Sequence, residues 1–233
     1  MVFWWQHLKI VLREKRSRLR EEMLRQQMNP HFIFNALIAI QSFIYQKKSL
    51  DAVQFLEQFS SLIRLMLISS QSDYVSVKDD IDLITYYLRI QKLRFDEKFD
   101  FNIECDPRIS ISETAIPPLL TQPFVENSIE HGFNGIEGKG FIQVKYELND
   151  GMLWVSISDN GRGIELPFMV RQTHREGHKS MGIYITQERL QILNKDLKGK
   201  PIVLNIAHNK LPGSVYPGTK VVFTLPLIKY TEP

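Results

Sequence analysis

The stretch Asn29-Pro30-His31-Phe32-Ile33-Phe34-Asn35 organises this chain of 233 residues, because it places an imidazole beside a proline inside a long helical pattern. A neutral imidazole, with an ordinary pKa of about 6.5, keeps a nitrogen lone pair free at neutral pH. That property suits a nucleophile that accepts a phosphoryl group. Asn35 follows one helical turn later on the same face, where it can orient the ring. The stretch predicts a catalytic pair, His31 and Asn35, and the alternative is a structural histidine within a helix bundle.

Helical patterns surround this stretch. Residues 8–46 are rich in Leu, Arg, Glu, Gln and Met, and Pro30 predicts a kink or a restart just before the histidine. Residues 47–49 indicate a turn, and apolar residues then recur at helical spacing over residues 52–66. A third helix is predicted to begin near Ser76, with Ser76 and Asp79 as its cap. The first two helices have apolar faces too wide for one partner, so we expect a second copy of the chain to complete a four-helix bundle.

The hydrophobic period changes to two from residue 99 onward. Apolar and polar residues alternate near residues 99–105, 142–146, 153–157 and 221–225, which predicts strands. Helices are predicted at residues 118–132 and 182–195, and residues 166–179 have no clear period and predict a loop. The fold class is therefore α+β: a helical hairpin followed by an α/β sandwich with a mixed sheet and helices on one face. The expected domain boundaries separate an N-terminal segment (1–20), the helical hairpin (21–75), a linker helix (76–98) and the α/β sandwich (99–233).

Charge and cysteine content narrow the class of protein. The single cysteine, Cys105, cannot form an internal disulfide, which favours a reducing compartment. Six basic residues and one acidic residue lie in residues 1–20, so the rest of this chain of net charge +3 is not basic. Direct nucleic-acid binding is therefore not expected. Aromatic residues ahead of that basic run are typical of a chain leaving a membrane on its cytoplasmic side. We expect this chain to be the cytoplasmic portion of an inner-membrane protein with an upstream transmembrane or sensor portion. The alternative is that residues 1–20 form a soluble helix whose charges are solvated.

The stretch Gln122-Pro123-Phe124-Val125-Glu126-Asn127-Ser128-Ile129-Glu130-His131-Gly132 has polar residues at helical spacing. Asn127 can offer an amide oxygen to Mg²⁺. This ion favours oxygen ligands and can take its other ligands from ATP phosphates. Glu126 can offer a carboxylate to the nucleophile. Taken alone, the stretch is a surface helix ended by Gly132.

Three glycine-containing stretches are candidates for contact with a nucleotide. In Val155-Ser156-Ile157-Ser158-Asp159-Asn160-Gly161-Arg162-Gly163-Ile164, a strand brings Asp159 to its end, where the carboxylate can accept the amine of adenine. Gly161 and Gly163 let the backbone approach a planar base.

The other two stretches add a predicted phosphate contact at Ser180 and Gly182 and a candidate cofactor-binding residue, Thr219. Ser180-Met181-Gly182-Ile183 opens a helix, whose free amides can bind phosphate. Gly218-Thr219 leads into the last strand. Each of these signals is weak singly, and their order along the chain is specific.

In this order the motifs resemble those of the GHKL ATP-binding fold and, within it, the LytS/YehU-type sensor histidine kinases, over residues 24–227. Residues 29–35 are similar to the phosphoacceptor box of that family and residues 126–132 to its N box. Residues 159–163 and 180–182 look like its two glycine boxes, and residues 166–179 like its ATP lid. The resemblance implies an ATP-dependent protein histidine kinase with a Bergerat-type domain. It also implies phosphorylation of His31, Mg²⁺ on Asn127 and adenine recognition by Asp159.

The resemblance further implies a homodimer that passes the phosphoryl group to an aspartate of a response regulator, often one with a LytTR-type DNA-binding domain. The sequence departs from the family at Ser180, where many members have glycine, and at Glu130, where lysine is frequent. Phosphate contacts then fall to His131, Arg162 or Lys179, and Glu126 is the candidate general base. Two alternatives remain open: a nucleotide-binding, non-catalytic dimeric interaction module, and an ATP hydrolase of the same fold.

Overall fold

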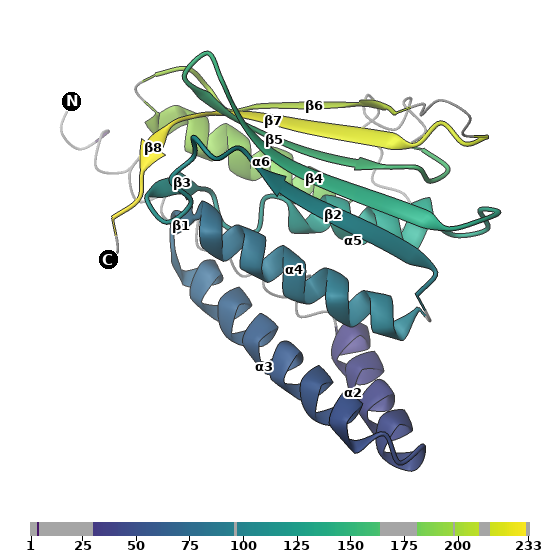
Figure 1. The fold of residues 1–233 in the computed structure, drawn as a ribbon. Coiled ribbons are helices and arrows are strands. Elements are labelled where there is room, and N and C mark those ends of the chain that lie inside the picture. The colour runs from purple at the N-terminus through teal and green to yellow at the C-terminus, as the bar shows by residue number, and fades with distance from the viewer. Residues whose placement is uncertain are drawn as a thin grey trace.

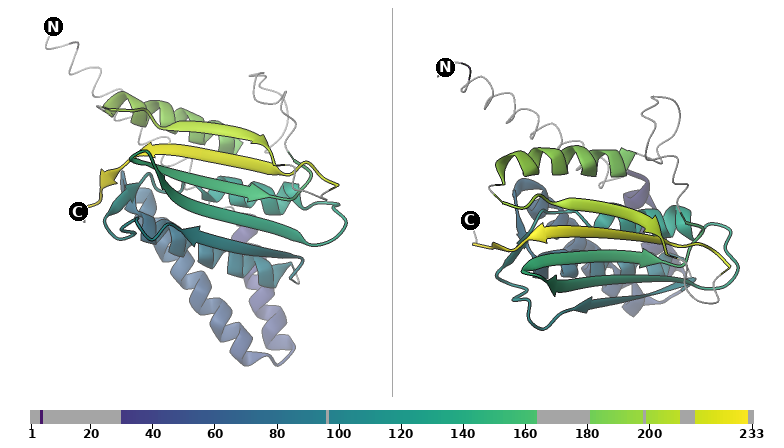
Figure 2. Two further views of the ribbon diagram at one scale, coloured as in Figure 1. Left: turned by 45° about the horizontal axis from the view of Figure 1, so that its top comes forward. Right: turned by 90° about the horizontal axis from the view of Figure 1, so that it is seen from above.

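A five-stranded sheet, a layer of helices on one of its faces and a helical hairpin beyond that layer make up the structure (Figures 1 and 2). The computed structural model describes residues 4, 30–95, 97–163, 181–197, 199–209 and 215–231. No helix in these ranges is long and apolar enough to cross a bilayer. The predicted helix over residues 8–29 and the predicted loop at 166–179 lie outside them.

The hairpin consists of α2 (Pro30–Tyr45) and α3 (Ser49–Gln71), joined by a short turn as predicted. Lys47 in that turn has a φ of 59°, which ends the first helix. The hairpin buries one apolar face, formed by Phe32, Ala36, Ala52, Phe55, Leu62 and Met66. This face rests on the next helix, so the hairpin is attached to the rest of the molecule by packing as well as by the chain (Figure 1).

Helix α4 (Val77–Arg94) lies between the hairpin and the sheet (Figure 1). Its N-terminus is capped as predicted, because the Ser76 hydroxyl accepts the backbone N–H of Asp79 at 3.0 Å. The same hydroxyl donates to the Asp79 carboxylate at 2.6 Å. On the hairpin side, the ring of Tyr87 stacks on that of Phe32 with centroids 5.7 Å apart. The helix predicted as a linker therefore shares one continuous apolar core with the hairpin and the sheet.

The large sheet has the strand order β2-β4-β5-β7-β6. Its strands are β2 (Phe99–Cys105), β4 (Gly140–Asn149), β5 (Met152–Asp159), β6 (Val203–His208) and β7 (Thr219–Pro226). Strands β2 and β4 run parallel and the other neighbours antiparallel, so the sheet is mixed as predicted. The four predicted strands are confirmed. The edge strand β6 was not predicted, because it buries no residue fully and its hydrophobic alternation is weak.

Helix α6 (Met181–Asp196) agrees with the prediction for residues 182–195, whereas the helix predicted at 118–132 is wrong at its start. Only α5 (Gln122–Asn127) is α-helical, and it continues as the π-helical turn η1 (Ser128–Gly132). Leu119 has a φ of 57°, which a right-handed helix cannot accommodate. Helices α4, α5 and α6 cover one face of the sheet (Figure 2).

A second, three-stranded sheet was not predicted either. It has the order β1-β3-β8, with β1 (Val75–Ser76), β3 (Thr114–Ile116) and β8 (Ile228–Lys229). Strands of two or three residues are too short to carry a readable period. This small sheet joins the segment before α4 to the segment before α5.

Candidate functional site

The centre of the candidate site is the carboxylate of Asp159 at the end of β5. One oxygen, Oδ1, accepts the backbone N–H of Gly161 at 2.9 Å and that of Thr219 at 3.2 Å. The other, Oδ2, accepts the hydroxyl of Ser128 at 2.7 Å. The structure thus brings together three of the predicted residues from β5, the following turn and β7, and adds Ser128 from η1.

Burial and several hydrogen-bond donors set the environment of Asp159. Burial raises the pKa of this carboxyl, and the bonds from Ser128, Gly161 and Thr219 oppose that rise. Thr219 donates to this carboxyl through its side-chain hydroxyl as well as through its backbone N–H. A carboxylate has the chemistry to accept the exocyclic amine of adenine, and that role of Asp159 stays a prediction.

The turn after β5 packs against the end of η1 so closely that no side chain fits between them. A Cβ on Gly161 would lie 2.5 Å from the carbonyl oxygen of Gly132. That same oxygen accepts the backbone N–H of Arg162 at 2.9 Å. Gly163, with a φ of 78°, and Gly218, with a φ of 57°, take up the left-handed conformation that favours glycine. Gly161 and Gly163 thus both lie at close contacts within the chain, and their predicted approach to a planar base stays a prediction.

Glu126 and Asn127 are half-buried on the last turn of α5, and His131 is exposed at the end of η1. A π-helical turn here offsets Ser128–Gly132 from the α-helical register, as is frequent at functional sites. Burial, and then the negative charge of Glu130, raise the pKa of Glu126 to about 7. A carboxyl group with a pKa near neutrality is suited to transferring protons at physiological pH.

Asn127 is the one predicted metal ligand. Its side chain supplies an amide oxygen, the ligand type that Mg²⁺ accepts together with phosphate oxygens and water. In the described part of the chain, no cluster of three or more His, Cys, Asp or Glu residues could hold a metal by itself. The amide oxygen of Asn127 is chemically compatible with an ion whose other ligands are nucleotide and water oxygens, and Mg²⁺ binding there stays a prediction.

The remaining predicted residues lie on α2 and α6 or outside the described residues. His31 is the second residue of α2, Asn35 is half-buried on the same helix, and Gly182 is in the first turn of α6. Ser180 lies outside the described residues. Next to His31, Phe32 packs on Tyr87.

Tyr87 interacts both with the start of α2 and with charged residues of the N box. Burial raises the pKa of Tyr87 well above its ordinary value, and the charges of Glu126 and Glu130 raise it further. The phenol is therefore within electrostatic reach of both carboxyl groups, while its ring contacts the residue that follows His31.

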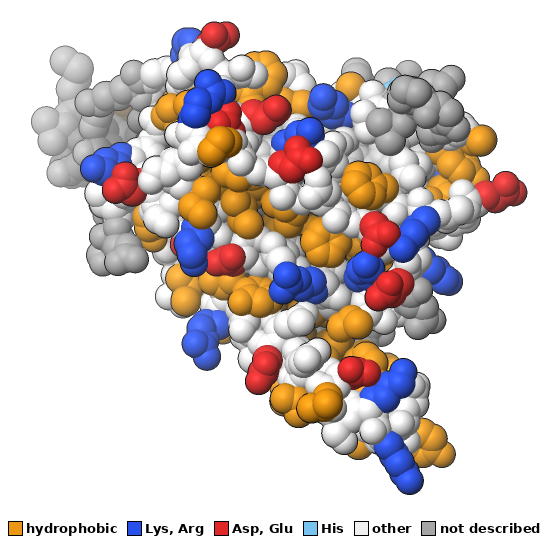
Figure 3. Space-filling model, viewed as in Figure 1, with side chains coloured by type: hydrophobic (Ala, Val, Ile, Leu, Met, Phe, Trp, Pro, Cys, Tyr) orange, Lys and Arg blue, Asp and Glu red, His pale blue; other side chains and the backbone are white. Residues whose placement is uncertain are grey.

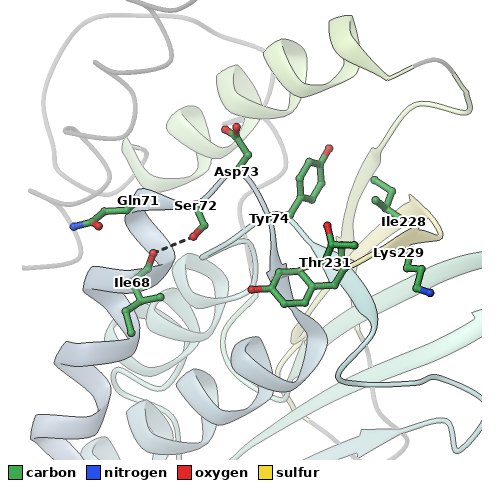
Figure 4. Close-up of a pocket in the computed structure, with 10 residues that line it drawn as sticks. Ile68, Gln71, Ser72, Asp73, Tyr74, Ile228, Lys229 and Thr231 are labelled. Atoms are coloured by element: carbon green, nitrogen blue, oxygen red, sulfur yellow. Dashed lines mark hydrogen bonds between the residues drawn. The ribbon is translucent and has the colours of Figure 1, made fainter. Parts of the chain in front are cut away.

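A cleft lies beside β8 (Figure 4). It is at the opposite end of β5 from Asp159. Strand register fixes this separation, since Asp159 pairs with Thr219 at one end of β5 and Met152 pairs with Pro226 at the other, beside β8. Its lining includes Ile68 and Ser72 from the end of α3, with a hydrogen bond from the Ser72 hydroxyl to the Ile68 carbonyl at 3.3 Å. None of the predicted site residues lines this cleft.

Sequence reasoning missed two contributors to the Asp159 environment. The side-chain amide of Asn209 donates to the Asp159 carbonyl at 3.2 Å. Ser128 lies inside the N-box stretch, next to Asn127, and its position one residue from a predicted ligand was the available signal. No comparable signal marked Asn209, because its contact depends on how β6 and β7 pair.

The fold and this site define a class of ATP-binding domain. A family model described as "Histidine kinase-, DNA gyrase B-, and HSP90-like ATPase" matches residues 119–229, and one described as "Histidine kinase" matches residues 19–99. The two models together cover most of the chain, and the relatives below include LytS proteins. The chain belongs to the LytS/YehU-type sensor histidine kinases.

Similar proteins include the sensor histidine kinase YesM of Bacillus subtilis, 26% identical over 87% of this chain and 32% of the relative. The sensor histidine kinase YpdA of Escherichia coli is 28% identical over 92% of this chain and 35% of the relative. The sensor protein LytS of Oceanobacillus iheyensis is 30% identical over 78% and 33%. The chain thus spans about a third of the length of these relatives. A solved bacterial phosphotransferase has a similar fold, with a TM-score of 0.51 at 14% identity, over 90% of this chain and 95% of the other.

Proposed function

We propose that this chain is the kinase portion of a two-component sensor and that it transfers the γ-phosphoryl group of Mg-ATP to its own His31. The observation that carries the proposal is the buried Asp159 carboxylate, which hydrogen bonds from Ser128, Gly161 and Thr219 hold at the end of β5. This arrangement supports adenine binding next to a helix that carries the N-box residues. The match of residues 119–229 to an ATPase-type family supports the use of ATP.

Four residues of this chain have a defined part in the proposed transfer. Asp159 binds the base, and Asn127 holds the Mg²⁺ that neutralises phosphate charge. A ring nitrogen of His31 forms a bond to the γ-phosphorus as the bond from that phosphorus to the β,γ-bridging oxygen breaks, and ADP leaves. Glu126, with a pKa of about 7, accepts the imidazole proton. Positioning and charge neutralisation supply most of the catalysis in phosphoryl transfer.

The hairpin supports the proposal of a homodimer. One face of α2 and α3 rests on α4, yet large apolar side chains on the hairpin are also exposed, among them Phe34, Ile38, Ile44, Leu50 and Val53. Figure 3 shows hydrophobic side chains on the surface of the hairpin end of the molecule, among charged ones. Burying such a surface against a second hairpin would complete a four-helix bundle.

The family membership supports onward transfer to a response-regulator aspartate, and we propose a LytTR-type regulator as the partner. We also propose that the kinase portion lies on the cytoplasmic side of the membrane, attached to an upstream sensor portion. Membership of a family of sensor kinases and the aromatic and basic residues in residues 1–20 support this placement.

Incubation of the purified chain with γ-labelled ATP tests the proposed function. We expect acid-labile, base-stable label on the wild-type chain, as a phosphorylated histidine gives, and none on His31→Ala. Asn127→Ala should bind nucleotide without transferring phosphate. Label that persists in His31→Ala would disprove the assignment, and steady phosphate release that is independent of His31 would indicate an ATP hydrolase.

A further inference from the structure

A buried carboxylate that the proposed chemistry does not use lies at the start of α4. Asp80 is 2% exposed, and its oxygens accept two side-chain hydroxyl groups from distant parts of the chain. The Tyr146 hydroxyl on β4 donates at 2.6 Å, and the Thr121 hydroxyl donates to both oxygens at 3.1 Å. All three side chains are buried.

A carboxylate is an unfavourable choice for this place on packing grounds alone. Burial raises the pKa of Asp80 to about 6, and the two hydroxyl groups only oppose that rise. An apolar side chain of similar size would avoid the desolvation cost, so the carboxylate is accounted for by what it holds.

What it holds is Thr121, the residue directly before α5. Thr121 precedes α5, and its carbonyl accepts the N–H groups of Phe124 at 3.1 Å and Val125 at 3.3 Å, the first hydrogen bonds of that helix. Its hydroxyl makes no capping bond to α5, because it is turned to Asp80 instead. The position of α5, and with it Glu126 and Asn127, therefore depends on where α4 lies.

Helix α4 in turn carries the hairpin. Tyr87, two turns after Asp80, stacks on Phe32 beside His31. The small sheet adds a second connection between α4 and α5, since Val75 and Ser76 before α4 pair with Ile116 and Ala115 before α5. One helix thus touches both the segment that presents the phosphoacceptor and the start of the segment that is proposed to bind the metal and the nucleotide.

We propose that Asp80 is a positioning residue: through Thr121 and Tyr146 it fixes the N-box helix relative to α4, so that a shift of α4 is passed to the nucleotide site. The inference rests on the proposed function for its consequence in catalysis. Its structural content, the dependence of α5 on Asp80, is measurable without any phosphoryl transfer.

The experiment compares Asp80→Asn and Thr121→Val with Asp82→Asn in the purified chain. Asp82 is a matched control because it is a partly exposed acid on the same helix, paired with Lys78 at 3.0 Å. Thr121→Val keeps the side-chain volume and removes only the hydroxyl. It therefore tests the same contact if Asp80→Asn fails to fold.

Amide hydrogen exchange is the first readout. We expect both variants, but not Asp82→Asn, to speed exchange in residues 122–132 at least about tenfold relative to residues 203–208 of β6. We also expect about tenfold weaker binding of an ATP analogue and slower autophosphorylation, since a misplacement of about 1 Å at an active site has effects of this size or more. The double variant should be little worse than either single one.

A merely structural role would lower the melting temperature and leave exchange in residues 122–132 and the nucleotide affinity unchanged at temperatures well below melting. That result would overturn the inference, as would full additivity of the two substitutions. If the wild type binds ATP without phosphorylating itself, the proposed function fails, while the exchange and affinity measurements still decide the role of Asp80.

Discussion

Gly161→Ala tests the close contact on which the nucleotide site is built. The added Cβ would lie 2.5 Å from the Gly132 carbonyl oxygen and 2.7 Å from its carbon, both backbone atoms that cannot rotate away. Ordinary van der Waals contact begins near 3.4 Å, so the turn and the end of η1 must separate by about 1 Å. This shift also removes the 2.9 Å bond from the Arg162 N–H to the Gly132 carbonyl.

The expected loss of stability follows from these two effects. Overpacking costs about 1–3 kcal/mol and the lost hydrogen bond about 1 kcal/mol, so the free energy of unfolding should fall by about 2–4 kcal/mol. Nucleotide affinity should fall about tenfold or more, because Asp159 Oδ1 loses its well-placed partner at Gly161. Urea denaturation and isothermal titration with an ATP analogue measure the two quantities.

Gly199→Ala is the matched control. No atom lies within 4 Å of its added Cβ, and the backbone there is not left-handed. Its stability should stay within about 0.5 kcal/mol of the wild type or rise slightly. If Gly161→Ala and Gly199→Ala were equally stable and bound nucleotide equally well, the reasoning about the contact with Gly132 would be refuted.

Three further outcomes are expected. Asp159→Asn places an amide against two backbone N–H donors, so nucleotide affinity should fall at least about tenfold by calorimetry, whereas the Asp82→Asn control should bind as the wild type does. Glu126 has a folded pKa of about 7 against an ordinary 4.5, so the folded chain binds its proton more tightly than the unfolded chain. The unfolding free energy should therefore fall as the pH rises from about 4.5 to about 7, by up to about 3 kcal/mol, and then level off. Urea titrations should show that Glu126→Gln lacks this contribution but keeps the similar one from Asp80 below pH 6; an unchanged slope between pH 6 and 7 would contradict the assignment. Ile38→Glu places a charge on a side chain that is 60% exposed in the single chain, so sedimentation should show a monomer where the wild type is a dimer, and a dimer that survives would argue against this face.

The sequence by itself determined the class of fold and the longer helices and strands, but not β6 or the small sheet. The change of hydrophobic period from about 3.6 to 2 near residue 99 gave the hairpin, α4 and four strands of the mixed sheet, because amphipathic periodicity is a local property of the chain. The cap at Ser76 was also readable, since its partner Asp79 is three residues away. The order of the motifs gave the family, which the family models confirm.

The tertiary structure decided which of these residues meet. Asp159 and Ser128 are 31 residues apart, and Asp80 lies 41 residues from Thr121 and 66 from Tyr146. No local pattern encodes such contacts, because they depend on how α4, the N-box helix and the sheet pack together. The late start of α5 at Gln122 was not readable either: Leu119 has a φ of 57°, and the side chain of Thr121 bonds to Asp80, a partner that the local sequence does not reveal.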